Sequence, residues 1–87
     1  MKVAVWDTYV AKADGVIMNF DILVPEAETN PEKIYGYGQD YLKSKAMQNY
    51  PITSNHCIFC HIEKATDAML KDIEQKGYSI IELKNCQ

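Results

Sequence analysis

The sequence predicts an α+β protein: a single small domain spanning residues 1–87, with the element order ββαβαβ. The expected sheet is mixed and four-stranded, begins with an N-terminal β-hairpin, and carries two helices on one face. Two observations predict this class. β-branched and aromatic residues flank an Asp-Gly pair near the N-terminus, and two later segments repeat apolar residues at helical spacing, each followed by a short apolar run.

The first 24 residues predict the hairpin. Its strands, residues 2–12 and 16–24, flank Asp14-Gly15, the favoured central pair of a type I′ turn. A two-residue loop at that pair places Tyr9 opposite Phe20 and Thr8 opposite Asp21. The expected core face then carries Val3, Val5, Asp7 and Tyr9 with Val16, Met18, Phe20, Ile22 and Val24, and the other face carries Ala4, Trp6, Thr8 and Val10 with Ile17, Asn19, Asp21 and Leu23.

Helix and strand signals then alternate. Asn30-Pro31 is typical of an N-cap followed by proline at the first helical position, which predicts a helix of about 15 residues. Gly38 lies on the apolar stripe of that helix, so we expect close packing against the sheet there. Residues 58–63 form the third expected strand, and a second helix follows from Thr66 to Gly77, a residue suited to the left-handed end of a helix. Residues 78–84 form the last expected strand.

Charge and hydropathy exclude several classes of function. Nine basic and twelve acidic residues give a net charge of −3, which disfavours binding to the phosphate backbone of nucleic acids. No apolar run approaches the roughly 20 residues that span a bilayer. Asp7 interrupts the first apolar stretch, so no signal peptide is expected. We therefore expect a cytoplasmic protein without membrane or nucleic-acid partners, whose three cysteines stay reduced.

A cysteine- and histidine-rich segment forms one candidate site. His56, Cys57, Cys60 and His61 offer four zinc-ligand side chains within six residues, so zinc is the alternative to a protein without a cofactor. In a strand, however, Cys57 and Cys60 point to opposite faces, which opposes one metal centre. The same segment matches the c-type haem pattern, which usually requires export, and the CxxC redox pattern, which usually lies at a helix N-terminus. The remaining interpretation is that Cys60 packs as a small hydrophobic residue.

The hairpin provides the second candidate site. Under the predicted register, Trp6, Thr8, Asn19 and Asp21 share the face that the helices leave open, so these are the expected binding residues. Exposed tryptophan favours interfaces, which predicts self-association into a homo-oligomer through this face. No nucleophile or oxyanion motif accompanies these residues, so no catalytic residue is assigned.

The chain also resembles a small bacterial protein family. The resemblance rests on Val5 to Val10, Asp14-Gly15, Met18, Phe20 to Val24, Cys57 to Glu63, Lys76 to Tyr78 and Cys86. That family is catalogued as a domain of unknown function with an α+β fold, so the resemblance implies a compact bacterial domain and no activity.

Two functional hypotheses follow from these observations. The first is a cytoplasmic binding or interaction module without catalytic activity, which uses Trp6, Thr8, Asn19 and Asp21. The second is a metal-binding or thiol-redox protein that uses the segment from His56 to His61. Neither hypothesis specifies a substrate or a pathway.

Overall fold

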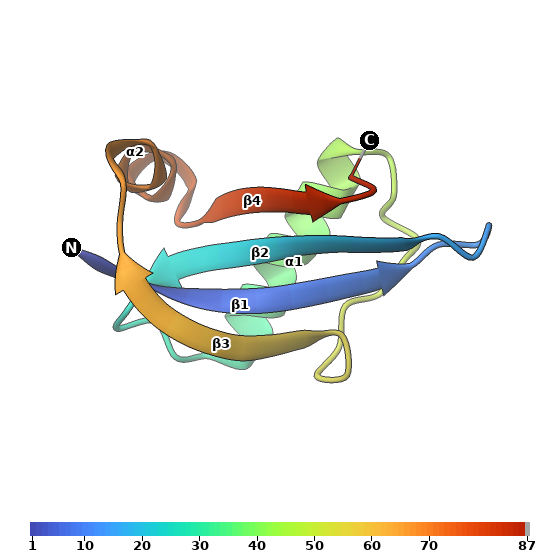
Figure 1. Cartoon of the computed structure of the whole chain (residues 1–87), viewed down its shortest axis with the longest axis horizontal. Coiled ribbons are helices and arrows are strands. Elements are labelled where there is room, and N and C mark those ends of the chain that lie inside the picture. The colour runs from blue at the N-terminus through green and yellow to red at the C-terminus, as the bar shows by residue number, and fades with distance from the viewer. Residues whose placement is uncertain (87) are drawn as a thin grey trace.

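The computed structural model of the protein describes residues 1–86 and has the predicted α+β class and element order (Figure 1). Its four strands form one open sheet in the order β3-β1-β2-β4, with a helix after β2 and another after β3. The elements are β1 (Lys2–Ala11), β2 (Ile17–Pro25), α1 (Pro31–Ser44), β3 (Cys57–Lys64), α2 (Asp67–Lys76) and β4 (Ser79–Lys84).

Every pair of neighbouring strands is antiparallel, so the expectation of a mixed sheet was wrong. The reason is the path of the chain after the hairpin. Helix α1 carries the chain back along the sheet, and β3 therefore runs parallel to β2. Strand β3 pairs with β1, however, and β1 runs the opposite way. Strand β4, which pairs with β2, likewise runs parallel to β1. Both parallel relations thus join strands that are not neighbours.

The hairpin forms as predicted, but its register differs by one residue. Thr8 lies opposite Phe20, and Ala11 lies opposite Ile17. Gly15 adopts the left-handed conformation (φ 85°) and Lys12 pairs with Val16, so the loop has three residues instead of two. A left-handed glycine at the third loop position is the usual geometry of such a loop. Because strand side chains alternate, this shift exchanges the two faces of β2 relative to β1.

Helix α1 covers one face of the sheet and lies behind the strands in Figure 1. It starts where predicted, with the Asn30 side chain accepting a hydrogen bond from the Glu32 N–H (3.1 Å). Gly38 is buried, and a Cβ at that position would lie 2.5 Å from Cδ1 of Ile52 and 3.0 Å from Cδ1 of Ile22. The predicted close approach at Gly38 is therefore confirmed. The core on this side contains Ala4, Val10, Met18, Phe20, Ile22, Val24, Ile34, Tyr41 and Leu42.

Helix α2 packs on the opposite face, so the expectation of two helices on one face was wrong. Strands β3 and β4 form opposite edges of the sheet, and the helix that joins them crosses the face that α1 leaves free. Met69 and Ile73 of α2 pack there against the core residues Val3, Val5 and Leu23. Figure 1 shows that α2 lies at one end of the sheet, away from the hairpin loop. Within residues 1–86, neither helix is long and apolar enough to cross a membrane.

Candidate functional site

The shifted hairpin register divides the four predicted binding residues between the two faces of the sheet. Trp6 and Thr8 point to the α1 side, where Thr8 is fully buried and Trp6 packs partly buried against the core. The expectation that Trp6 lies on an uncovered face was therefore wrong. Asn19 and Asp21 point to the α2 side, where Asp21 lies directly opposite Asp7. The sequence placed Asp7 on the other face, and the three-residue loop is what brings the two carboxylates together.

The half of the α2-side face that the helix does not cover forms a polar centre with apolar surroundings. Side-chain alternation and strand pairing give its members, which we call the open sheet face: Asp7, Tyr9, Ile17, Asn19, Asp21, Ile58, His61 and, on the edge strand β4, the exposed Lys84 opposite Asn19.

The centre of the open sheet face is a hydrogen-bonded group of Asp7, Asn19 and Asp21. Nδ2 of Asn19 donates to Oδ1 of Asp7 (2.9 Å) and to the backbone oxygen of Thr8 (2.9 Å), which orients the Asp7 carboxylate. Burial, and then the hydrogen bond and charge of Asp7, raise the pKa of Asp21 from 3.8 to about 6, while nearby His61 acts in the opposite direction. Asp21 therefore loses its proton near pH 6, well above the pH at which an isolated aspartate does.

Tyr9 is electrostatically coupled to this centre. The negative charge of Asp7 and a hydrogen bond to its carboxylate raise the pKa of the Tyr9 hydroxyl above its ordinary value. The Tyr9 side chain is nevertheless exposed. It therefore presents an uncharged phenol to solvent beside the two aspartates.

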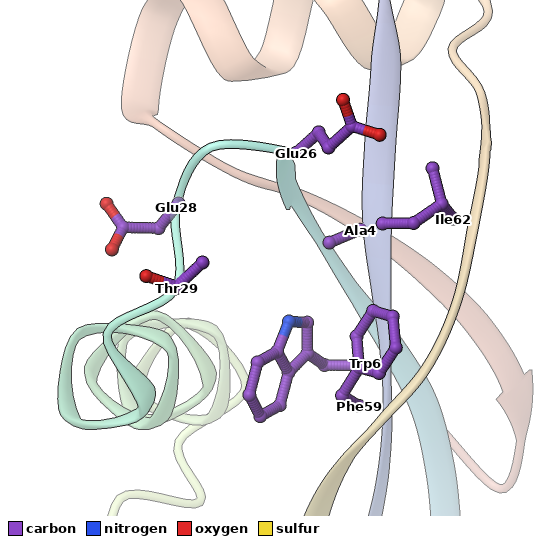
Figure 2. Close-up of a pocket in the computed structure, with 7 residues that line it drawn as sticks. All are labelled: Ala4, Trp6, Glu26, Glu28, Thr29, Phe59 and Ile62. Carbon is purple, nitrogen blue, oxygen red and sulfur yellow. The ribbon is translucent and has the colours of Figure 1, made fainter.

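A cavity of about 280 Å³ lies on the other face, between the edge strand β3, strand β1 and the connection from β2 to α1 (Figure 2). We call it the Trp6 cavity, and its lining residues are Ala4, Trp6, Glu26, Glu28, Thr29, Phe59 and Ile62. The Trp6 and Phe59 rings meet edge to face at 70°, with centroids 5.9 Å apart. Within residues 1–86, the Trp6 indole N–H is the one buried side-chain polar group without a hydrogen-bond partner.

The four predicted metal ligands do not meet at one point. His56 turns toward Thr53, whose hydroxyl lies 2.8 Å from Nδ1. Cys57 is buried on the α1 side, where it accepts a hydrogen bond from the Thr8 hydroxyl (3.3 Å). Cys60 and His61 are exposed, with Sγ and Nδ1 3.1 Å apart. The part of the chain that the structure describes contains no group of three or more Cys, His, Asp or Glu residues placed to hold a metal ion.

The cysteines also differ from what the packing interpretation expected. Cys60 is exposed, and Cys57 is the buried member of the pair, so that interpretation was assigned to the wrong residue. Strand β3 has a bulge opposite Val5 and Trp6, which interrupts the simple alternation. Burial raises the pKa of the Cys57 thiol, which makes it a weak nucleophile at neutral pH.

Comparison with known proteins identifies the family. A family model described as a domain of unknown function, DUF2024, matches residues 1–83. The chain belongs to the DUF2024 family. The NMR structure of protein NE1680 from the bacterium Nitrosomonas europaea, a structural genomics target, is similar to this DUF2024 chain with 34% identity and a TM-score of 0.87, over 100% of both chains. A search of the curated proteins gave no match.

Sequence reasoning missed most of the residues that line the Trp6 cavity in this DUF2024 chain. Glu26, Glu28 and Thr29 belong to an irregular connection, where no periodic pattern indicates a direction. Phe59 and Ile62 lie on either side of the β3 bulge, so a strict alternation assigns one of them to the wrong face. The pairing of Asp7 with Asp21, which was also missed, could have been predicted from the apolar pattern of the two strands. The apolar series Met18, Phe20, Ile22 and Val24 matches the even-numbered residues of β1 if Gly15 closes a three-residue loop.

Proposed function

We propose that this protein is a non-catalytic cytoplasmic binding module whose open sheet face recognises a basic protein partner. The observation that carries the proposal is the exposure of Tyr9 (49%), Ile17 (47%) and Ile58 (62%) on the same face as the two aspartates. Apolar side chains gathered on a surface with polar neighbours are typical of protein interaction sites. A cytoplasmic location is consistent with Cys57, Cys60 and Cys86, which are all free thiols.

The pair of aspartates at the centre of the open sheet face favours a basic partner. Docking would remove Asp7 and Asp21 from water, which is unfavourable unless a positive group compensates. A lysine or arginine side chain can take the place of the proton that Asp21 otherwise holds up to about pH 6. A second copy of this chain, docked face to face, would instead bring two carboxylate pairs together. The predicted homo-oligomer is therefore disfavoured through this face at neutral pH.

The setting of the carboxylates favours binding over catalysis. They lie on an open sheet surface, whereas an acid–base reaction needs a substrate held within hydrogen-bond reach of its catalytic groups. The thiol of Cys57, which pairs with Thr8 next to Asp7, points to the opposite face of the sheet. The exposed apolar side chains provide the docking area, and the aspartates provide the charge preference.

NMR titration tests the proposal. ¹⁵N-labelled protein is titrated with apolar peptides that carry Lys or Arg and with matched peptides that carry Glu. We expect the basic peptides to shift the amide resonances of Tyr9, Asn19 and Ile58, with weaker binding as the pH falls through about 6 because Asp21 becomes protonated. Asp21→Asn should reduce the affinity roughly tenfold, the effect of about 1.4 kcal/mol of lost charge pairing.

Glu74→Gln is the matched control, because it removes one exposed carboxylate from α2 and should leave binding unchanged. Equal binding of the acidic peptides, or shifts confined to residues outside the open sheet face, would contradict the proposal. Sedimentation at pH 7.5 tests the alternative. A dimer that Ile58→Asp converts to a monomer would assign the face to self-association.

A further inference from the structure

The Trp6 cavity lies on the opposite side of the sheet from the open sheet face, and it carries a separate inference. Its size, about 280 Å³, is near the lower end of the range typical of small-molecule sites, roughly 300–1,000 Å³. It therefore suits a small ligand more than a protein segment. Figure 2 shows which elements line it: Ala4 and Trp6 come from β1, Phe59 and Ile62 from β3, and Glu26, Glu28 and Thr29 from the connection before α1.

The first recognition element of the cavity is the Trp6 indole N–H. Burying a hydrogen-bond donor without an acceptor is unfavourable, and such groups deserve a specific explanation. Among residues 1–86 no group accepts from Nε1 of Trp6. In Figure 2 the indole nitrogen lies on the edge of the ring that faces the space between Ala4, Glu26 and Thr29. Nε1 has almost no accessible surface, so a ligand supplies the missing acceptor when the side chains that line the cavity shift to admit it.

The second recognition element is the charge at the rim. Glu28 is already compensated, because its carboxylate lies 3.2 Å from Nζ of Lys33 and accepts the backbone N–H of Asn30 (3.1 Å). Glu26 is exposed, and within the described chain its carboxylate has no ion pair. The uncompensated carboxylate of Glu26 repels anions, so a neutral acceptor suits the indole better than an anionic one. Glu26 in turn favours a positive group on the same ligand.

The third element is the apolar wall. Trp6 and Phe59 stand at 70° to each other, which gives two differently oriented aromatic surfaces, and Ala4 and Ile62 complete the lining. We propose that the Trp6 cavity binds a small apolar amine that also carries a neutral hydrogen-bond acceptor, such as a carbonyl oxygen. The ammonium group pairs with Glu26, the acceptor takes the indole N–H, and the apolar body packs against the aromatic rings. This ligand site is independent of the open sheet face.

The single tryptophan makes the proposal directly testable. The indole N–H of Trp6 gives one ¹H–¹⁵N resonance, which moves downfield when it donates a hydrogen bond. The probes are leucinamide, which has all three features, N-acetyl-leucinamide, which lacks the charge, and isopentylamine, which lacks the carbonyl. We expect a saturable downfield shift with leucinamide, binding at least tenfold weaker with the acetylated probe, and no downfield shift with isopentylamine.

Two variants complete the test. Glu26→Gln changes an exposed side chain, so the fold should persist, and it should weaken leucinamide binding roughly tenfold. Glu74→Gln, an equal loss of charge on α2, should leave that binding unchanged. The proposal is overturned if leucinamide leaves the indole resonance unmoved, if both leucine probes bind equally well, or if Glu26→Gln binds like the unmodified protein. Resonances of Tyr9 and Ile58 report the open sheet face in the same spectra, which keeps the two sites distinguishable.

Discussion

The two faces of this sheet are built from the same strands, but one is covered by a helix along its length and the other is covered only in part. On the α1 side, the even-numbered residues of β1 and β2 pack under a 14-residue helix into one large core. On the α2 side, a 10-residue helix covers Val3, Val5 and Leu23 and leaves the rest of the face open. A single strand therefore contributes to the core through one set of side chains and to a candidate binding surface through the other. A short second helix is what keeps Asp7 and Asp21 accessible.

The largest effect should come from comparing the two cores. Phe20 and Leu23 lie three residues apart in β2, and both side chains are fully buried. Phe20 faces the α1 side of the sheet and Leu23 faces the α2 side. Phe20→Ala removes a ring that lies 4.6 Å from the Tyr41 ring and should lower the free energy of unfolding by about 4 kcal/mol. Leu23→Ala should cost about 2.5 kcal/mol, because the smaller α2 cluster can close over the lost volume.

Urea unfolding followed by circular dichroism measures both losses. If either alanine variant fails to fold, Phe20→Leu and Leu23→Val give the same ranking at smaller amplitude. An equal or larger loss at Leu23 would show that the α2 side is packed as tightly as the α1 side, and the contrast between the faces would fail.

An intermediate effect should come from the carboxylate pair. The pKa of Asp21 rises from 3.8 to about 6 in the folded protein, so the folded state keeps this proton to higher pH than the unfolded chain does. The stability from Asp21 is therefore fully present below about pH 4 and is lost as the pH rises through about 6. Because the group is partly exposed, solvent screening reduces the loss to about 1 kcal/mol.

Asp21→Asn should accordingly stabilise the protein by about 1 kcal/mol at pH 7.5 and leave its stability unchanged near pH 4. Urea unfolding at the two pH values measures this difference, and Glu74→Gln serves as the control carboxylate. If Asp21→Asn stabilises the protein equally at both pH values, the charge of Asp21 is not destabilised by burial or by Asp7. The open sheet face would then lose the feature that most distinguishes it from the covered side.

The smallest effect should come from two glycines in α1, which compare the solvent side of that helix with its core side. A Cβ at Gly36 meets no atom within 4 Å, so Gly36→Ala should stabilise the protein by about 0.5–1 kcal/mol through helix propensity alone. At Gly38 the same methyl group would collide with Cδ1 of Ile52. Gly38→Ala should therefore be less stable than Gly36→Ala in thermal unfolding. If Gly38→Ala proved the more stable variant, the loop that carries Ile52 would have to move without cost, and α1 would not pack closely there.

Sequence reasoning succeeded wherever a local rule decides the outcome. The N-cap at Asn30 and the left-handed Gly77 at the end of α2 each depend on neighbours within a few residues. The close approach at Gly38 was predictable from its place on the apolar stripe of α1, although the side chains that it meets, Ile22 and Ile52, are distant in sequence. The extent of the hairpin strands was also predictable, because β-branched and aromatic residues mark them. The hairpin register was not, since an Asp-Gly pair fits a two-residue loop and also a three-residue loop that ends in a left-handed glycine. The one-residue difference in register places Trp6 on the side of the sheet that α1 covers.

The sequence by itself determined the α+β class, the order of the elements, and the family to which the chain is similar, because periodicity, caps and motifs are properties of short segments. Only the tertiary structure decided which residues meet. The pairing of Asp7 with Asp21, the position of α2 on the free face and the lining of the Trp6 cavity all join segments far apart in the chain. Such contacts depend on register and on the path of the connections, and one residue of register reverses every side chain of a strand.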